Sequence, residues 1–217
     1  MTLSLNEIEA LCAKAAKGAG RSWGTAEETG LAAGWLARNG IDGAAMVLRA
    51  LEATDGQAEA ELCPVVLAGR MQAPESRPLC PIATGIALSD FRNLPEGQLG
   101  EGNLTLGNVI QPILLAPFLA SIANTSGKAI TLTTDAETAC FSPDQTLLPP
   151  GLSALNIARV KLRATDAGAR SRGTAARGIL SPDPSVIDRL SALALRTTVP
   201  PSEKSRTDAG AAADDND

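Results

Sequence analysis

The feature that most constrains the fold of this 217-residue chain is a change in the spacing of its apolar residues. Over the first 53 residues they recur every three or four positions, as on the buried face of a helix. From Leu155 to Ala164 they alternate instead with the basic residues Arg159, Lys161 and Arg163. Such alternation is typical of a strand with one solvated face in an antiparallel or mixed sheet. The chain therefore predicts an α+β fold, in which an N-terminal cap of three helices lies on a mixed or antiparallel sheet with packed helices.

Polar residues mark the starts of the three N-terminal helices. Ser4 and Glu7 have the spacing of a capping box, in which a hydroxyl and a carboxylate satisfy backbone N–H groups at a helix start. Thr25 and Glu28 predict a second capping box, and Asp42 predicts the cap of a third helix.

The remaining sequence predicts shorter elements. Residues 62–67 and 79–83 share the pattern Leu-Cys-Pro-aliphatic and predict two related strands. Further strands are expected at 104–109 and at 130–134 with 139–141, a central helix at 112–124, and a last helix ending near Arg196. We expect one domain over residues 1–200, with a helical subregion at 1–55 and an α/β body at 61–200. Residues 201–217 predict an acidic tail that is expected to be flexible.

Composition excludes several classes of function. The chain has no histidine, so a Ser-His-Asp triad, a Cys-His dyad and a His-ligated metal are all excluded. Neither a metal nor a cofactor is expected. Four widely spaced cysteines, without a C-x-x-C pair, predict reduced thiols and a cytoplasmic protein: Cys12, Cys63, Cys80 and Cys140. The apolar part of the uncharged segment 103–127 is too short to span a membrane.

The overall net charge of −5 argues against nucleic acid as a partner. A local run of basic residues contrasts with this overall charge. Six bases and one acid lie between Arg159 and Arg177. Within this run Arg170, Arg172 and Arg177 stand among glycines and can form forked hydrogen bonds to a carboxylate or phosphate. They predict a site for a small anion, and the alternative is a solvated loop that aids solubility.

Two groups of acidic residues are candidates for chemistry. Glu27 and Glu28 follow Trp23, so they either stabilise a helix start or place a carboxylate beside an indole, where general acid catalysis and ligand contact are both possible. Asp90 either ends a strand or places a carboxylate at a strand end, where sites in α/β sheets gather. Cys63 or Cys80 as a nucleophile would need an activator other than histidine.

Several motifs resemble an uncharacterised bacterial family known as a domain of unknown function. The resemblance is carried by SLNEIEAL at residues 4–11 and GAGxxWGxAEExG at 18–30, and by VPxSExSR at 199–206 with DND at 215–217. It extends along the whole chain. It implies no activity and therefore no catalytic residues.

Three functions remain open. The first is binding of a small anionic metabolite or a partner enzyme, through the arginine-rich loop and the turn from Trp23 to Glu28. The second is a small metabolic enzyme in which Glu27 or Asp90 is the acid or base and Arg170 and Arg172 hold the substrate. The third is assembly into a homo-oligomer.

Overall fold

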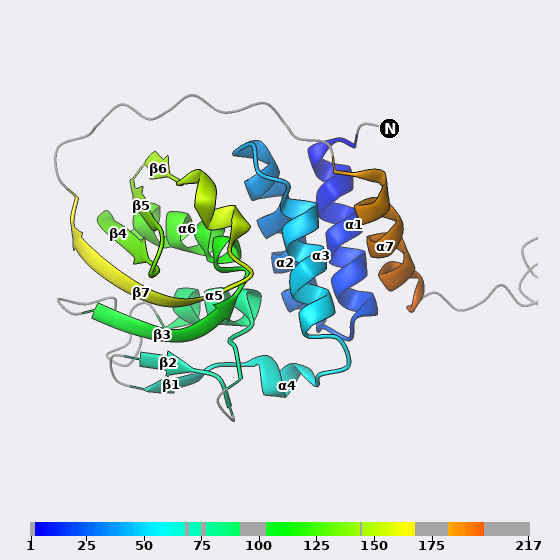
Figure 1. Ribbon diagram of the computed structural model, residues 1–217, viewed down its shortest axis with the longest axis horizontal. Helices are drawn as coiled ribbons and strands as arrows, with labels where there is room; N and C mark the ends of the chain where they lie inside the picture. The colour runs from blue at the N-terminus through cyan, green and yellow to red at the C-terminus, as the bar shows by residue number, and fades with distance from the viewer. Residues whose placement is uncertain are drawn as a thin grey trace, which may run out of the picture.

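Four helices form a layer beside the sheet in the computed structural model (Figure 1). The structure describes residues 3–67, 70–74, 77–91, 103–143, 145–167 and 182–197. The layer consists of α1 (Leu5–Gly18), α2 (Trp23–Arg38), α3 (Gly43–Ala53) and α7 (Pro184–Leu195). Although α7 follows every strand in the sequence, it packs on α1 and α3. The first three helices therefore form the predicted N-terminal cap, and α7 adds a fourth helix to it.

The seven described strands form one mixed sheet in the order β1-β2-β3-β7-β4-β5-β6. Every neighbouring pair is antiparallel except β2 and β3, which are parallel. The strand bounds are β1 Val65–Leu67, β2 Arg70–Gln72, β3 Asn103–Ile110, β4 Lys128–Thr133, β5 Thr138–Ser142, β6 Gln145–Leu147 and β7 Ile157–Asp166. The α+β fold class and the mixed sheet are confirmed.

Helices cover one face of this sheet. They are α5 (Pro81–Asp90), the 3-10 helix η2 (Pro112–Leu115) and α6 (Ala116–Ser126), and the strands curve around them (Figure 1). On β7, Val160 and Leu162 are fully buried, while Arg159, Lys161 and Arg163 are exposed. The predicted alternation is thus confirmed, with the apolar side chains facing the helices. The short α4 (Glu59–Leu62) and the 3-10 helix η3 (Pro150–Ala154) complete the described elements.

The predicted helix starts are confirmed at two of three positions. Ser4 and Glu7 form the capping box of α1, and the Asp42 carboxylate accepts from the backbone N–H of Ala45 at 2.9 Å. The capping box at Thr25 is wrong, because α2 begins earlier and Ser22 is its N-cap. The Thr25 hydroxyl donates instead to the carboxylate of Glu59, the first residue of α4, at 2.6 Å.

Glycines let neighbouring helices approach closely. A Cβ atom at Gly30 would lie 2.5 Å from the carbonyl oxygen of Glu9 on α1, and one at Gly18 would lie 1.8 Å from the carbonyl oxygen of Leu193 on α7. Both distances are far below van der Waals contact, so larger residues cannot occupy these positions without moving a helix axis.

Two predictions for the body are corrected. Leu79 makes a single bridge to Val109, and the chain then enters α5 with Pro81 in its first turn, so residues 79–83 are not a strand. Proline suits that position because the first helical residues need no N–H donor. The predicted helix at 112–124 begins as η2, and α6 takes over at Ala116 with Pro117 in its first turn.

None of the helices in the described ranges is both long and apolar enough to cross a membrane. The division of the chain at residue 200 and the tail 201–217 lie outside the described residues, so they stay predictions.

Candidate functional site

The open face of the sheet carries four basic side chains. Arg159, Lys161 and Arg163 follow one another on β7, and Arg70 lies on β2. All four are exposed, and none forms an ion pair or hydrogen bond with another part of the chain that the structure describes. We call these four residues the basic face.

Strand register places three residues of the basic face in two adjacent rows, and Arg159 lies opposite Asn108 beyond them. One row crosses four strands and consists of Arg70, Thr105, Lys161 and Thr133, in that order. In the next row Arg163 lies between Asn103 and Thr131. Because register partners point to the same side of a sheet, the cations stand among hydroxyl and amide groups. Asp166, the last residue of β7, has the one carboxylate among the described strand residues. It is even-numbered like Val160 and Leu162, so it points to their side of the sheet and away from the basic face.

A groove of about 360 Å³ lies on the other side of α5 and α6, where these helices meet α2. One wall is a helical stripe of α2 that includes Glu28, Leu31 and Trp35, and the opposite wall includes Phe118 of α6. Its volume is within the range of small-molecule sites. The groove therefore offers apolar and aromatic surface with a few charged groups at its edge.

Of the charged side chains that line the groove, Arg38 and Glu9 form an ion pair with each other, whereas Glu28 has no partner within the described residues. Arg38 donates to Glu9 at 2.9 Å. That contact needs Gly34, since a Cβ there would lie 2.0 Å from the Glu9 carboxylate oxygen. Glu28 has neither an ion pair nor a hydrogen bond within the described residues.

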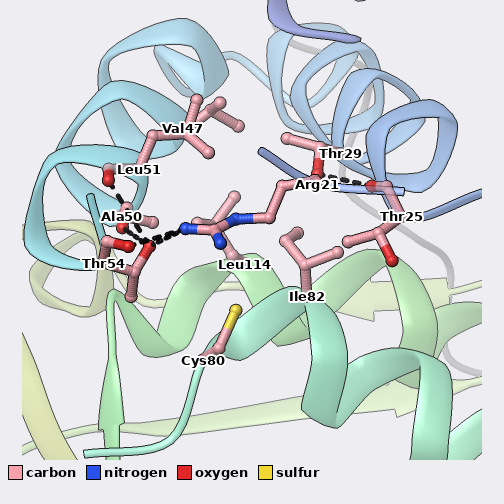
Figure 2. Close-up of a pocket in the computed structure, with 10 residues that line it drawn as sticks. All are labelled: Arg21, Thr25, Thr29, Val47, Ala50, Leu51, Thr54, Cys80, Ile82 and Leu114. Atoms are coloured by element: carbon pink, nitrogen blue, oxygen red, sulfur yellow. Dashed lines mark hydrogen bonds between the residues drawn. The ribbon is translucent and has the colours of Figure 1, made fainter. Parts of the chain in front are cut away.

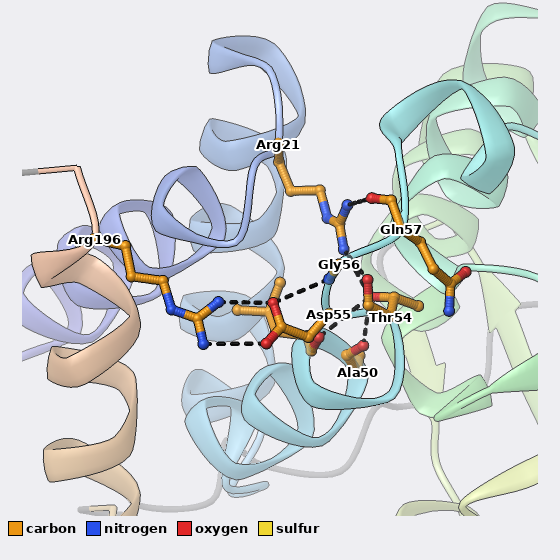
Figure 3. Close-up of polar contacts among 8 residues, drawn as sticks. Arg21, Ala50, Thr54, Asp55, Gly56, Gln57 and Arg196 are labelled. Carbon is orange, nitrogen blue, oxygen red and sulfur yellow. Dashed lines mark hydrogen bonds and ion pairs between the residues drawn. The ribbon is translucent and has the colours of Figure 1, made fainter.

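A third polar cluster surrounds Arg21, in the turn between α1 and α2. Arg21 is 2% exposed, and its guanidinium donates to the carbonyl oxygen of Thr54 at 2.8 Å, the Thr54 hydroxyl at 2.9 Å and the carbonyl oxygen of Gln57 at 3.1 Å (Figure 3). Thr54 is the C-cap of α3, so the cation lies at the negative end of that helix. These contacts give Arg21 a structural role, joining the α1–α2 turn to the end of α3.

The cavity beside Arg21 is too small for an organic ligand. It measures about 20 Å³ and is lined mainly by apolar side chains, with the Cys80 sulfur directed toward it (Figure 2). Burial raises the pKa of the Cys80 thiol, while backbone N–H groups of Ala83 and Ile82 and the charge of Arg21 lower it by less. The thiol is therefore protonated at neutral pH, and its environment does not suit a nucleophile.

The structure does not bring the predicted site residues together. Glu27 and Asp90 are exposed, on α2 and at the end of the helix α5, so the interpretation of Asp90 as the end of a strand is wrong. Trp23 is 70% exposed, and the Lys17 ammonium lies 5.0 Å from the centroid of its ring. Glu28, in contrast, lines the groove. Arg170, Arg172 and Arg177 lie outside the described residues.

Arg70 and Arg38 were missed by sequence analysis. The register that aligns Arg70 with β7 depends on β3, more than 30 residues away in the sequence, so no local signal reveals it. The stripe Glu28, Leu31, Trp35 does have helical spacing and could have indicated a common face.

Within the described ranges, no group of three or more Cys, Asp or Glu side chains could hold a metal ion. The arrangement thus offers two surfaces for binding, one basic and open, one grooved and partly apolar.

Comparison with protein families matches residues 3–74 to a family described as Protein of unknown function (DUF3726). This segment runs from the start of α1 through β2, and it confirms the resemblance to a domain of unknown function there. The C-terminal motif lies outside it. Neither the curated proteins nor the solved structures contain a match to this chain.

Proposed function

We propose that this protein binds an acidic segment of a partner protein on the basic face. The observation that carries the proposal is the alignment of Arg159, Lys161 and Arg163 on one exposed strand, with Arg70 across the sheet and without a carboxylate partner in the described chain. Such a face supplies charge complementarity to a negative surface. A cytoplasmic setting, expected from the cysteines, is part of this proposal.

The spacing of the cations fits an extended acidic segment. Alternate residues of a strand repeat at roughly 6.8 Å, which is also the repeat of alternate carboxylates in an extended peptide. Thr105, Thr133 and Asn103 can donate further hydrogen bonds to carboxylate oxygens between the cations. An extended partner could therefore meet several cations in register.

Two other anions fit the face less well. Single-stranded nucleic acid binds through stacking on aromatic rings as well as phosphate contacts. The one aromatic residue in the described strands is Phe141, which is buried with Ile130 on the other face of the sheet. A small metabolite needs a concave site, and neither the groove nor the cavity beside Arg21 is lined by a residue of the basic face. The anion site expected at Arg170, Arg172 and Arg177 stays a prediction, as do the enzyme and the homo-oligomer.

The test is a titration of a fluorescein-labelled peptide of ten glutamates, followed by fluorescence anisotropy at several salt concentrations. We expect saturable binding that weakens as salt rises, because exposed charges are screened. Replacing both Lys161 and Arg163 by Ala should weaken binding by roughly tenfold, since each exposed ion pair contributes up to about 1 kcal/mol.

The matched control replaces Lys14 and Arg49 by Ala, which removes the same charge from exposed positions on α1 and α3. If this variant weakens binding as much as the first, the effect is long-range and the proposal fails. A labelled oligothymidylate serves as the second probe, and tighter binding of this probe than of the peptide would assign the face to nucleic acid instead.

A further inference from the structure

The groove between α2 and α6 is separate from the basic face, because α5 and α6 lie between the groove and the sheet. Two of its apolar lining residues, Ala32 and Phe118, are almost fully buried. Leu31, which also lines the groove, is 54% exposed and leaves apolar surface that a ligand could cover.

Packing holds the two walls in place. A Cβ at Gly85 of α5 would lie 2.3 Å from the Phe118 ring, so the glycine lets this ring lie directly against α5. On the opposite wall Glu28, Leu31 and Trp35 are three and four residues apart and share one face of α2. A site on two packed helices keeps its shape without a ligand, which lowers the entropic cost of binding.

The charge in the groove favours a cation over an anion. Arg38 is already paired with Glu9, so an anionic ligand would have to compete with an intramolecular carboxylate. Glu28 has no partner within the described chain, and its carboxylate can accept hydrogen bonds from an ammonium group. Trp35 and Phe118 add aromatic surface, and aromatic faces attract cations.

We infer that the groove binds a small amphipathic amine, whose ammonium group pairs with Glu28 and whose apolar body lies against Trp35 and Phe118. This inference concerns a second site and does not depend on the proposed acidic partner. It assigns a ligand class to the groove: a primary amine on a flat, apolar body about the size of one aromatic ring.

Three probes of nearly equal size test the charge of the ligand: 2-phenylethylamine, 2-phenylethanol and 3-phenylpropanoate. The full chain with Trp23→Phe serves as the reporter, because Trp35 is then its one tryptophan. We expect the amine to change Trp35 fluorescence saturably and to bind roughly tenfold tighter than the alcohol, given the strength of charge-assisted hydrogen bonds.

Replacing Glu28 by Gln in this reporter should remove the preference for the amine over the alcohol. The same change at the exposed neighbour Glu27 is the matched control and should keep it. Circular dichroism of each variant establishes that the helices are retained.

Equal losses in the Glu27 and Glu28 variants would overturn the inference, since the amine would then respond to net charge alone. So would tighter binding of 3-phenylpropanoate, which would assign recognition to Arg38, or the absence of saturable binding by all three probes up to millimolar concentration.

Discussion

Replacing Arg21 by Met gives the strongest test of how the helical layer is held together. Methionine keeps much of the apolar stem but removes every donor. The carbonyl oxygens of Thr54 and Gln57 then lose their guanidinium partner. The positive charge at the end of α3 is lost as well, whereas Thr54 keeps its hydroxyl contact with Ala50.

The expected loss in free energy of unfolding follows from these contacts. The Gln57 carbonyl loses its guanidinium donor at a cost of about 1 kcal/mol, whereas the Thr54 carbonyl loses less because it still accepts from the backbone N–H of Gln57 at 3.3 Å. A cation in a partly buried place at a helix end contributes about 1 kcal/mol. Part of this is offset because the guanidinium no longer has to be desolvated. The expected destabilisation is about 2 kcal/mol.

Urea unfolding at pH 7, followed by far-UV circular dichroism, measures this loss. The midpoint should fall while the slope with urea stays constant, which indicates that the folded state is otherwise unchanged. Arg49→Met is the control, because Arg49 is exposed on α3, and it should change stability by less than about 0.5 kcal/mol. If Arg21→Met is as stable as the control, the contacts with α3 do not stabilise the fold and the reasoning is refuted.

Three further predictions concern packing, pH and thiols. Gly30→Ala should lower stability by about 1–3 kcal/mol in urea unfolding because the new methyl meets backbone of α1, whereas Gly34→Ala meets the flexible Glu9 side chain and should cost less; equal losses would contradict this. Although burial raises the pKa of Glu59, hydrogen bonds from Thr25 and Ser22 lower it by more, so the net pKa lies below its usual value. The stabilisation is therefore present above the ordinary glutamate pKa of about 4.3 and is lost as the pH falls through the folded-state value. The stability difference between the wild type and Glu59→Gln should accordingly vanish in acid, and a difference that persists there would have another cause. Finally, Ellman's reagent should label Cys63 and Cys140 rapidly in the native protein but Cys12 and Cys80 only after unfolding, since the last two are buried; rapid labelling of all four would contradict the described burial.

Local signals in the sequence predicted the helices better than the sheet. The capping box at Ser4 and the cap at Asp42 satisfy N–H groups a few residues away, so their spacing is visible in the sequence. Thr25 has the same spacing with Glu28, but Ser22 precedes it and begins the helix first. Spacing alone does not distinguish between two candidate caps that are three residues apart.

The sites depended on contacts that sequence spacing does not encode. The cations of β7 were visible as an alternating run, but Arg70 joins them through β3. The groove needs α2 and α6 side by side, although some 80 residues separate them in the sequence. Glu28 was predicted to contact a ligand, and its place in the groove comes from the packing of α2 beside α6.

The position of α7 has a consequence for the order in which the chain folds during synthesis. Residues 184–195 close the layer that residues 5–53 begin, and the carbonyl of Leu193 lies where a Cβ of Gly18 would be. The ribosome delivers α1 first and its partner α7 more than 160 residues later, so one side of α1 lacks its packing partner until all the described strands have been synthesised. Long-range contacts of this kind slow folding, because a large loop must close before they form. The N-terminal helices, although they have clear local signals for structure, therefore complete their packing only after α7 has been synthesised.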